Sequence, residues 1–178
     1  MPYELEKLNV LLVEDNFSMR ILLRDVLAAF GIKNVISISD GGKAWRELRD
    51  FPADIAIVDW NMRPVSGLQF VKRVRQGRDS PNPFLPVIML TAYSKRRRVM
   101  IGRDAGVTEF LVKPVTPKRL YERIATIIEH NRGFIHSQTY FGPDRRRSDK
   151  GVIGVIGAER RNQFSMTVND FNNMRSNP

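Results

Sequence analysis

Four apolar runs in the sequence each lead into polar residues that could take part in phosphate or metal chemistry. Carboxylates follow two of the runs, a hydroxyl follows the third, and an ammonium group follows the fourth. These residues are Glu14 and Asp15 after Val10–Val13, Asp59 after Ile55–Val58, Thr91 after Val87–Leu90, and Lys113 after Phe110–Val112. Continuous apolar runs of this length are typical of parallel strands that are buried on both faces. Because the carboxyl ends of such strands meet at one edge of a sheet, we expect these side chains to form one ligand site.

The residue types at this edge favour a divalent cation and phosphorus chemistry. Carboxylates held close together repel one another, so each is costly unless a cation joins them. Mg²⁺ suits such a cluster because it binds through one or two carboxylates and keeps several waters. A carboxylate beside the ion could attack phosphorus and form an acyl phosphate. Phosphoryl transfer needs mainly positioning and neutralised oxygens, which an ammonium group and a hydroxyl can help to supply.

Each residue also has an ordinary structural explanation when it is considered singly. The Glu14–Asp15 pair could open a loop, Asp59 could cap a helix, and Thr91 could be a turn residue. Lys113 could be a solvated lysine before a proline. These explanations would have to coincide at four strand ends, so the joint pattern favours a single site.

An alternation of five strands and five helices must position these residues. The predicted strands are Lys7–Val13, Asn34–Ile38, Ile55–Asp59, Val87–Thr91 and Thr108–Val112. Helical patterns fill the gaps between the strands and follow the last one. Connections of this kind place successive strands in parallel. We therefore expect a doubly wound α/β fold, with a five-stranded parallel sheet and helices on both faces.

The predicted helices have apolar faces and recognisable start signals. Asn16 or Ser18 caps the first helix, the third covers Leu68–Arg75, Ser94 caps the fourth, and the last begins at Pro117. The residues expected to face inward are Met19, Leu22, Leu23, Val26 and Leu27 in the first helix, Ala44, Trp45 and Leu48 in the second, and Leu120, Ile124, Ile127 and Ile128 in the last.

Taken in order, these features resemble the receiver domain of bacterial two-component response regulators. The resemblance covers residues 7–131, and it rests on the Glu14–Asp15 pair, Asp59, the run from Asp59 to Gly67, Thr91–Ala92 and Lys113–Pro114. One departure is visible, because the family usually places proline directly after the loop methionine, whereas Arg63 separates Met62 from Pro64 here. The resemblance implies a flavodoxin-like receiver fold of five βα units with the strand order 2-1-3-4-5.

The resemblance also implies which residues accept the phosphoryl group and hold the metal. Asp59 is expected to be the phosphoacceptor. Mg²⁺ is expected to be held directly by Asp15 and Asp59, through a water by Glu14, and by the main-chain carbonyl of Asn61. We expect signalling by this acceptor and no enzymatic activity beyond self-phosphorylation and slow autodephosphorylation.

A switch and a readout face follow from the same resemblance. Thr91 and Lys113 are expected to contact the phosphoryl group. When Thr91 moves toward the phosphoryl group, Phe110 is expected to pack inward. The readout face is then the fourth helix, the fifth strand and the fifth helix, which is also a candidate homodimer interface. It carries the basic row Lys95, Arg96, Arg97 and Arg98. A solvated charged face is the alternative explanation of this row.

The expected partners are a cognate histidine kinase or phosphotransfer protein and a downstream protein effector. Phosphatases of the haloacid dehalogenase type also use an aspartate at a strand end with Mg²⁺. They need a second acid two residues later for proton transfer, and Asn61 stands at that position. Their nucleophile also precedes the other acids in the chain, whereas the Glu14–Asp15 pair comes first here. We therefore exclude that class.

We divide the chain into a receiver domain, residues 1–132, and an Arg-rich C-terminal extension, residues 133–178. The extension is expected to be mostly irregular, and either partly disordered or partner-binding. It is too short for a helix-turn-helix output domain. Its candidate partner-binding residues are Arg145, Arg146 and Arg147, whose guanidinium groups suit carboxylates or phosphates. A transcription-type regulator or a nucleic-acid-binding protein that uses this basic tail is the alternative.

Charge and composition weigh against the nucleic-acid alternative. The net charge is +10, divided as +7 in residues 1–132 and +3 in residues 133–178, so it is not concentrated in the tail. Asp144, Asp149 and Glu159 stand beside the arginine runs and oppose phosphate binding. The chain has no cysteine, which excludes thiolate chemistry. It has no apolar run long enough to span a membrane, and we expect a cytoplasmic protein.

Overall fold

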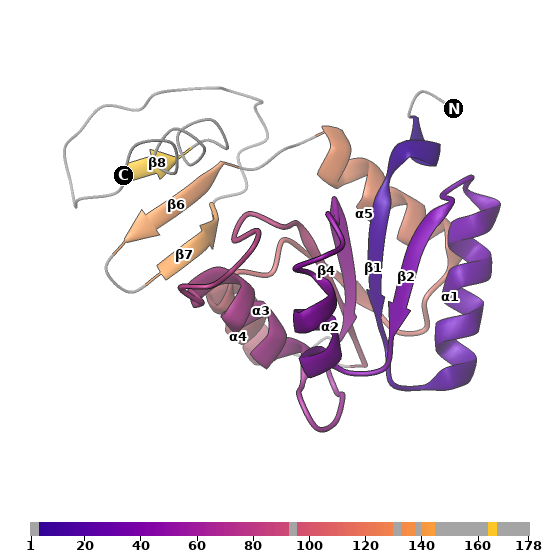
Figure 1. Ribbon diagram of the computed structural model, residues 1–178, viewed down its shortest axis with the longest axis horizontal. Coiled ribbons are helices and arrows are strands. Elements are labelled where there is room, and N and C mark those ends of the chain that lie inside the picture. The colour runs from indigo at the N-terminus through magenta and orange to yellow at the C-terminus, as the bar shows by residue number, and fades with distance from the viewer. Residues whose placement is uncertain (1–3, 93–95, 130–132, 138–139, 145–163, 167–178) are drawn as a thin grey trace.

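The apolar runs form a parallel sheet in the computed structural model, which describes residues 4–92, 96–129, 133–137, 140–144 and 164–166 (Figure 1). The strands of this sheet are β1 (Asn9–Val13), β2 (Asn34–Ile38), β3 (Ile55–Asp59), β4 (Val87–Thr91) and β5 (Glu109–Val112). They pair in the order β2-β1-β3-β4-β5, and all neighbouring pairs are parallel. The predicted sheet and its predicted strand order are both confirmed.

Helices cover both faces of the sheet and divide the core into two layers (Figure 1). One face carries α1 (Phe17–Ala29) and α5 (Pro117–Glu129), and the other carries α2 (Gly41–Glu47), α3 (Gly67–Gln76) and α4 (Arg96–Ala105). Successive strand residues point to opposite faces. In β1, Leu11 packs in the layer of Trp45, whereas Leu12 packs in the layer of Leu23. None of the described helices is long and apolar enough to cross a membrane.

Local capping chemistry sets the start of α1. The Asn16 side chain accepts a hydrogen bond from the backbone N–H of Met19 at 2.9 Å, so Asn16 caps this helix and Ser18 lies within it. The last helix begins at Pro117, as predicted. Ser94, the predicted cap of the fourth helix, lies outside the described residues.

Three details of the predicted elements are wrong. Leu22 is 52% exposed and does not face the core. The next residue, Leu23, is buried, and neighbouring residues of a helix point in directions about 100° apart. Ile128 is 37% exposed because Ile127 takes the inward position in the last turn of α5. The first strand begins later than predicted, since Leu5–Lys7 forms a 3-10 turn that buries its leucine side chain.

The segment after α5 contains strands that the sequence analysis does not predict. β6 (Phe134–Ser137) and β7 (Tyr140–Pro143) form an antiparallel hairpin, and β8 (Phe164–Met166) pairs with the other edge of β6. The prediction of a mostly irregular extension is therefore refined for these residues. Strands of three or four residues are too short to give a recognisable period-2 pattern.

Aromatic rings attach the β6–β7 hairpin to the loop before β4. The Phe84 ring of this loop lies 5.0 Å from the Phe134 ring and 5.2 Å from the Phe141 ring, measured between centroids, and both contacts are edge to face. Phe84 and Phe134 are buried. β7 also contacts α3 and α4 (Figure 1). The hairpin therefore packs against the layer of helices formed by α3 and α4.

A buried arginine completes this attachment. Arg75 of α3 is 4% exposed and donates hydrogen bonds to three main-chain carbonyls, those of Gly106 (3.0 Å), Pro83 (2.7 Å) and Leu85 (2.7 Å). Its guanidinium also lies 5.1 Å from the centroid of the Phe134 ring. Burial lowers the pKa of Arg75 to about 9, so the side chain stays charged at neutral pH. Main-chain dipoles and an aromatic face compensate the cost of burying this charge.

We expect removal of the hairpin to lower stability. A chain truncated after Arg132 lacks both hairpin phenylalanines and exposes Phe84 and Arg75, whereas a chain truncated after Asp144 keeps these contacts. Loss of one buried phenylalanine costs about 3 kcal/mol. In urea denaturation, the shorter chain should therefore have a free energy of unfolding lower by about that amount. Equal stability of the two truncated chains would contradict the packing role of the hairpin.

Candidate functional site

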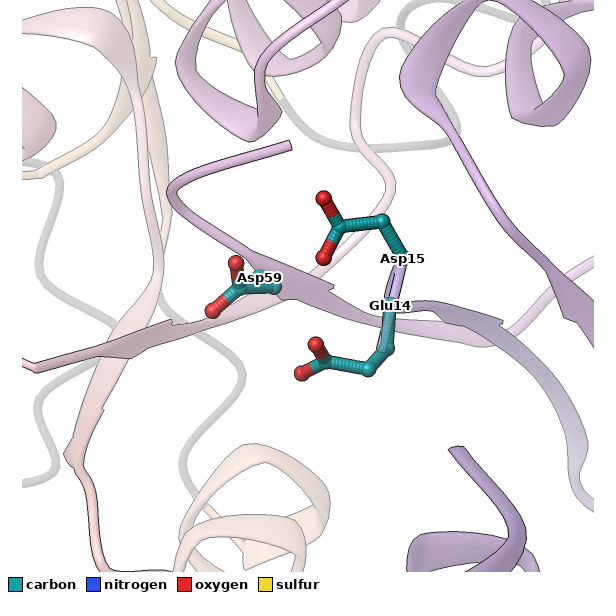
Figure 2. Close-up of side chains that lie close together, drawn as sticks. All are labelled: Glu14, Asp15 and Asp59. Carbon is teal, nitrogen blue, oxygen red and sulfur yellow. The ribbon is translucent and has the colours of Figure 1, made fainter. Parts of the chain in front are cut away.

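Three carboxylates meet at the carboxyl edge of the sheet (Figure 2). Glu14 and Asp15 follow β1, and Asp59 is the last residue of the neighbouring strand β3. One oxygen of each carboxylate lies within 4.8 Å of the corresponding oxygens of the other two. Glu14 and Asp59 are 1% and 5% exposed, whereas Asp15 faces solvent. The structure thus brings the three predicted acids together around one space.

Lys113 supplies positive charge to this cluster from the segment that follows β5. Its Nζ lies 2.8 Å from Oδ1 of Asp59 and 2.9 Å from Oε2 of Glu14. One ammonium group therefore bridges carboxylates that belong to two different strands. Asp15 lies close to both of these carboxylates, so the ionised cluster has three negative charges beside one ammonium group and keeps an excess of negative charge.

Burial and charge act in opposite directions on the ionisable groups. Burial raises the pKa of Glu14, and the charge of Asp59 adds to this effect, while the hydrogen bond from Lys113 offsets only part of it. Burial alone would lower the pKa of Lys113, but its hydrogen bonds to Asp59 and Glu14 raise it instead. Lys113 therefore stays protonated at neutral pH, and the charge on Glu14 is held at a cost in stability.

Hydrogen bonds with the main chain orient the acids. The backbone N–H of Asn61 donates to Oδ2 of Asp59 at 2.9 Å, which leaves Oδ1 to Lys113. Arg20 of α1 donates to the main-chain carbonyl of Glu14 at 2.7 Å. The sequence analysis does not identify Arg20, because a basic residue on a surface helix carries no signal of such a contact.

α3 packs directly on the end of β3. Ser66 and Gln69 form a capping box that starts α3 at Gly67. A side-chain carbon at Gly67 would collide with the main-chain carbonyl of Asp59 and lie 2.9 Å from Cγ1 of Val58. Only glycine allows this close approach of the helix, so Gly67 fixes the main chain that carries the Asp59 carboxylate.

Thr91 and Phe110 lie on the next two strands of the sheet, β4 and β5. The strand register pairs Asp59 with Leu90, so Thr91 lies one residue further along the neighbouring strand, where it is buried. The Thr91 carbonyl accepts a hydrogen bond from the backbone N–H of Lys113 at 2.8 Å. Phe110 of β5 is half-buried and packs with the residues of the α2–α4 layer.

The other predicted site residues are placed in part. Arg96 and Arg97 are exposed at the start of α4. Arg98 is half-buried, with its guanidinium 5.8 Å from the centroid of the Trp60 ring, so it is not part of a fully solvated row. Lys95, Arg145, Arg146 and Arg147 lie outside the described residues. For Asn61, the main-chain carbonyl stays a predicted ligand.

The donor set at this edge suits a hard divalent cation. Carboxylate oxygens are the donors that Mg²⁺ prefers, and an excess of negative charge favours binding of the ion. The exposure of Asp15 also suits an ion that retains several waters. The residues present therefore fit a magnesium ion.

Comparison with known proteins agrees with this geometry. The family model described as the response regulator receiver domain matches residues 10–125. The chemotaxis protein CheY1 of Helicobacter pylori is 35% identical over 126 residues, which cover 70% of this chain and 99% of CheY1. CheY-3 of Vibrio cholerae is 32% identical over 124 residues, which cover 70% of this chain and 94% of CheY-3. The crystal structure of V. cholerae CheY4 superposes with a TM-score of 0.63 at 32% identity, covering 67% of this chain and 98% of CheY4.

The fold and the acidic edge define a doubly wound α/β signalling domain. The chain belongs to the response regulator receiver domain family, and it is a two-component receiver homologous to the CheY chemotaxis proteins. The family match ends at residue 125, before β6 begins at Phe134. The hairpin therefore lies outside the part of the chain that the family model describes.

We expect Glu14→Gln to stabilise the metal-free protein at neutral pH. Burial raises the pKa of Glu14 in the folded state above its ordinary value of 4.5. The stability associated with protonated Glu14 is therefore present below pH 4.5 and is lost as the pH rises through the folded-state pKa. Gln cannot ionise, so it avoids this loss.

Thermal denaturation in a chelator should show this as a pH-dependent difference in Tm. The variant and the parent should be similar in acid, and the variant should become the more stable of the two toward neutrality. Glu122→Gln, at an exposed position of α5, is the matched control and should shift Tm little at any pH. A Glu14→Gln protein that is less stable than the parent at neutral pH would contradict the assigned cost of burial.

Proposed function

We propose that Asp59 accepts a phosphoryl group from a histidine kinase or phosphotransfer protein, and that the phosphorylated chain signals through protein contacts. The observation that carries this proposal is the arrangement of the Asp59 carboxylate. Its two oxygens contact the Lys113 ammonium and the Asn61 N–H, and two further carboxylates lie within 4.8 Å. Such a group is oriented, charged and placed where a cation can join it.

The proposed transfer is a displacement at phosphorus. An oxygen of Asp59 forms a bond to phosphorus while the bond from phosphorus to the donor's imidazole nitrogen breaks, and the electron pair returns to that nitrogen. The Lys113 ammonium, which now faces Asp59, is placed to neutralise the phosphoryl oxygens. The Thr91 hydroxyl, from the adjacent strand, can donate a hydrogen bond to one of them.

Mg²⁺ is the proposed cofactor of this step. Asp15 and Asp59 would hold it directly, Glu14 would hold it through a water, and the main-chain carbonyl of Asn61 would complete the protein ligands. The bound ion would supply positive charge that offsets both the carboxylates and the phosphoryl oxygens. Three clustered carboxylates, of which two contact the single ammonium group of Lys113, support this assignment.

The proposed output is a change in the face formed by α4, β5 and α5. Phosphorylation would draw Thr91 toward Asp59, and the Phe110 ring would then pack inward. Arg96 and Arg97 are exposed on this face and could contact an acidic effector surface or a second copy of the chain. The relatives are named as chemotaxis proteins, which supports a protein effector and a cytoplasmic site of action.

Replacement of the acceptor should abolish labelling. We expect Asp59→Asn to lose phosphorylation by a cognate histidine kinase or a small acyl phosphate, because an amide oxygen is a poor nucleophile toward phosphorus. Asp50→Asn, at an exposed position after α2, is the matched control and should be labelled like the parent. Acid-labile, hydroxylamine-sensitive phosphate that persists on Asp59→Asn would contradict the assignment.

Loss of a metal ligand should act on ion binding without unfolding the chain. We expect Asp15→Ala to weaken Mg²⁺ binding by about tenfold or more and to prevent phosphorylation, as chelation should do in the parent. Titration of Mg²⁺ against intrinsic tryptophan fluorescence measures this, since one of the two tryptophans, Trp60, directly follows Asp59. Asp25→Ala, at an exposed position of α1, should bind like the parent. Unchanged phosphorylation in excess chelator would contradict the role of the metal.

A further inference from the structure

The main chain of the β6–β7 hairpin comes close to the main chain at the end of α4. Gly106 follows the last residue of α4, and a side-chain carbon on Gly142 of β7 would lie only 3.0 Å from the Gly106 Cα. On another side, Arg75 donates to the Gly106 carbonyl and packs on the Phe134 ring of β6. The end of α4 is thus held jointly by α3 and by the hairpin.

The conformation and surroundings of Gly106 require glycine at this position. Its φ of +95° favours glycine, and an added side-chain carbon would lie 2.8 Å from Cγ of Arg75. Gly106 and Gly142 have no side chains that could change rotamer and absorb a shift of the helix. A displacement of this end of α4 has to move β7 or separate from it.

The other end of α4 leads into the acidic site. Only residues 92–95 separate Thr91 from Arg96, the first residue of α4. Along the helix, a side-chain carbon on Gly102 would lie 2.7 Å from the Phe110 ring and 2.9 Å from the Trp60 ring. Trp60 directly follows Asp59 in the chain. α4 therefore packs through Arg98 and Gly102 on Trp60, the residue after Asp59, and meets the hairpin just beyond its last residue.

We propose that the β6–β7 hairpin is a clamp on α4 and that its docking is coupled negatively to phosphorylation of Asp59. The coupling rests on the function proposed above, in which Thr91 moves toward the phosphoryl group. That movement pulls on the segment that begins α4, while the hairpin holds the end of the helix in its present position. Phosphorylation therefore weakens hairpin docking and makes the extension more available to a protein partner.

The coupling acts in both directions. If occupancy of the Asp59 site weakens docking of the hairpin by some factor, then loss of docking strengthens occupancy of the site by the same factor. This reciprocity allows an experiment to distinguish a clamp coupled to the site from a hairpin that only stabilises the fold. A hairpin that only stabilised the fold would leave the affinity of the site unchanged when its packing is weakened.

Hydrogen exchange of the full chain tests the first direction. The probe is beryllofluoride with Mg²⁺, which mimics a phosphoryl group on a carboxylate, and fluorine NMR reports its binding independently. We expect the amides of β6 and β7 to exchange about fivefold faster in the bound state. Bound beryllofluoride with unchanged or slower exchange in the hairpin would overturn the clamp and leave the acceptor assignment intact.

Two variants test the second direction. Phe134→Leu keeps an apolar side chain but loses the ring contacts with Phe84, Phe141 and Arg75, and it should bind beryllofluoride about fivefold more tightly than the parent. The matched control is Phe30→Leu, which removes an edge-to-face contact with Tyr121 on the opposite face of the sheet and should leave the affinity unchanged.

The other possible results of these experiments distinguish failure of the clamp from failure of the acceptor assignment. Equal affinity of Phe134→Leu and the parent overturns the clamp, as does the same gain in both phenylalanine variants, because general loosening would then be the cause. Absence of bound beryllofluoride in the parent, even with excess Mg²⁺, overturns the acceptor assignment and with it the coupling. Asp59→Asn should abolish the exchange response while the hairpin keeps its protection.

Discussion

One ammonium group joins carboxylates that come from distant parts of the chain, and the site depends on this contact. Lys113 and Glu14 are 99 residues apart, and β3 and β4 lie between the strands that they follow. The Lys113 side chain reaches both Glu14 and Asp59 only if the central strands end at the same edge in the observed register. A slip of one residue in β5 would turn its side chains to the opposite face and remove the positive charge from the cluster. The alignment of β1, β3, β4 and β5 is therefore visible in two distances at the edge of the sheet.

The fold was largely predictable because its central strands carry an unambiguous signal. β3 and β4 are apolar at every position before their last residue and are buried on both faces, which is the pattern of a parallel sheet. Helix faces were less certain, since Leu22 and Ile128 lie beside the inward stripe and periodicity alone does not decide on which side of its border they fall. The hairpin gave no signal because its packing partners are distant in the sequence: Phe84 and Arg75 lie 50 and 59 residues before Phe134.

The side chains that form the site could be predicted from the sequence, but the contacts that hold their main chain in place could not. Glu14, Asp15, Asp59 and Lys113 each follow a strand, so topology alone brings them together. Arg20 supports the same cluster through the main-chain carbonyl of Glu14, and an ordinary helix residue has the same appearance in a sequence. Gly67 closes the recognised run that begins at Asp59, but its close approach to the Asp59 carbonyl cannot be read from the sequence. Arg98 shows the opposite limit: a row of charges suggests solvent, yet one member packs on Trp60.

The partners of Arg75 have a consequence for how this architecture can drift in evolution. The guanidinium binds the carbonyls of Gly106, Pro83 and Leu85, and every amino acid carries a carbonyl. At positions 83 and 85, substitutions that preserve the main-chain path keep these acceptors, so the contact imposes no pairwise constraint on side-chain identity there. Among chains that share the extension, correlated substitutions would connect Phe84 with Phe134. The buried charge of Arg75 would have no co-varying side chain at positions 83 and 85.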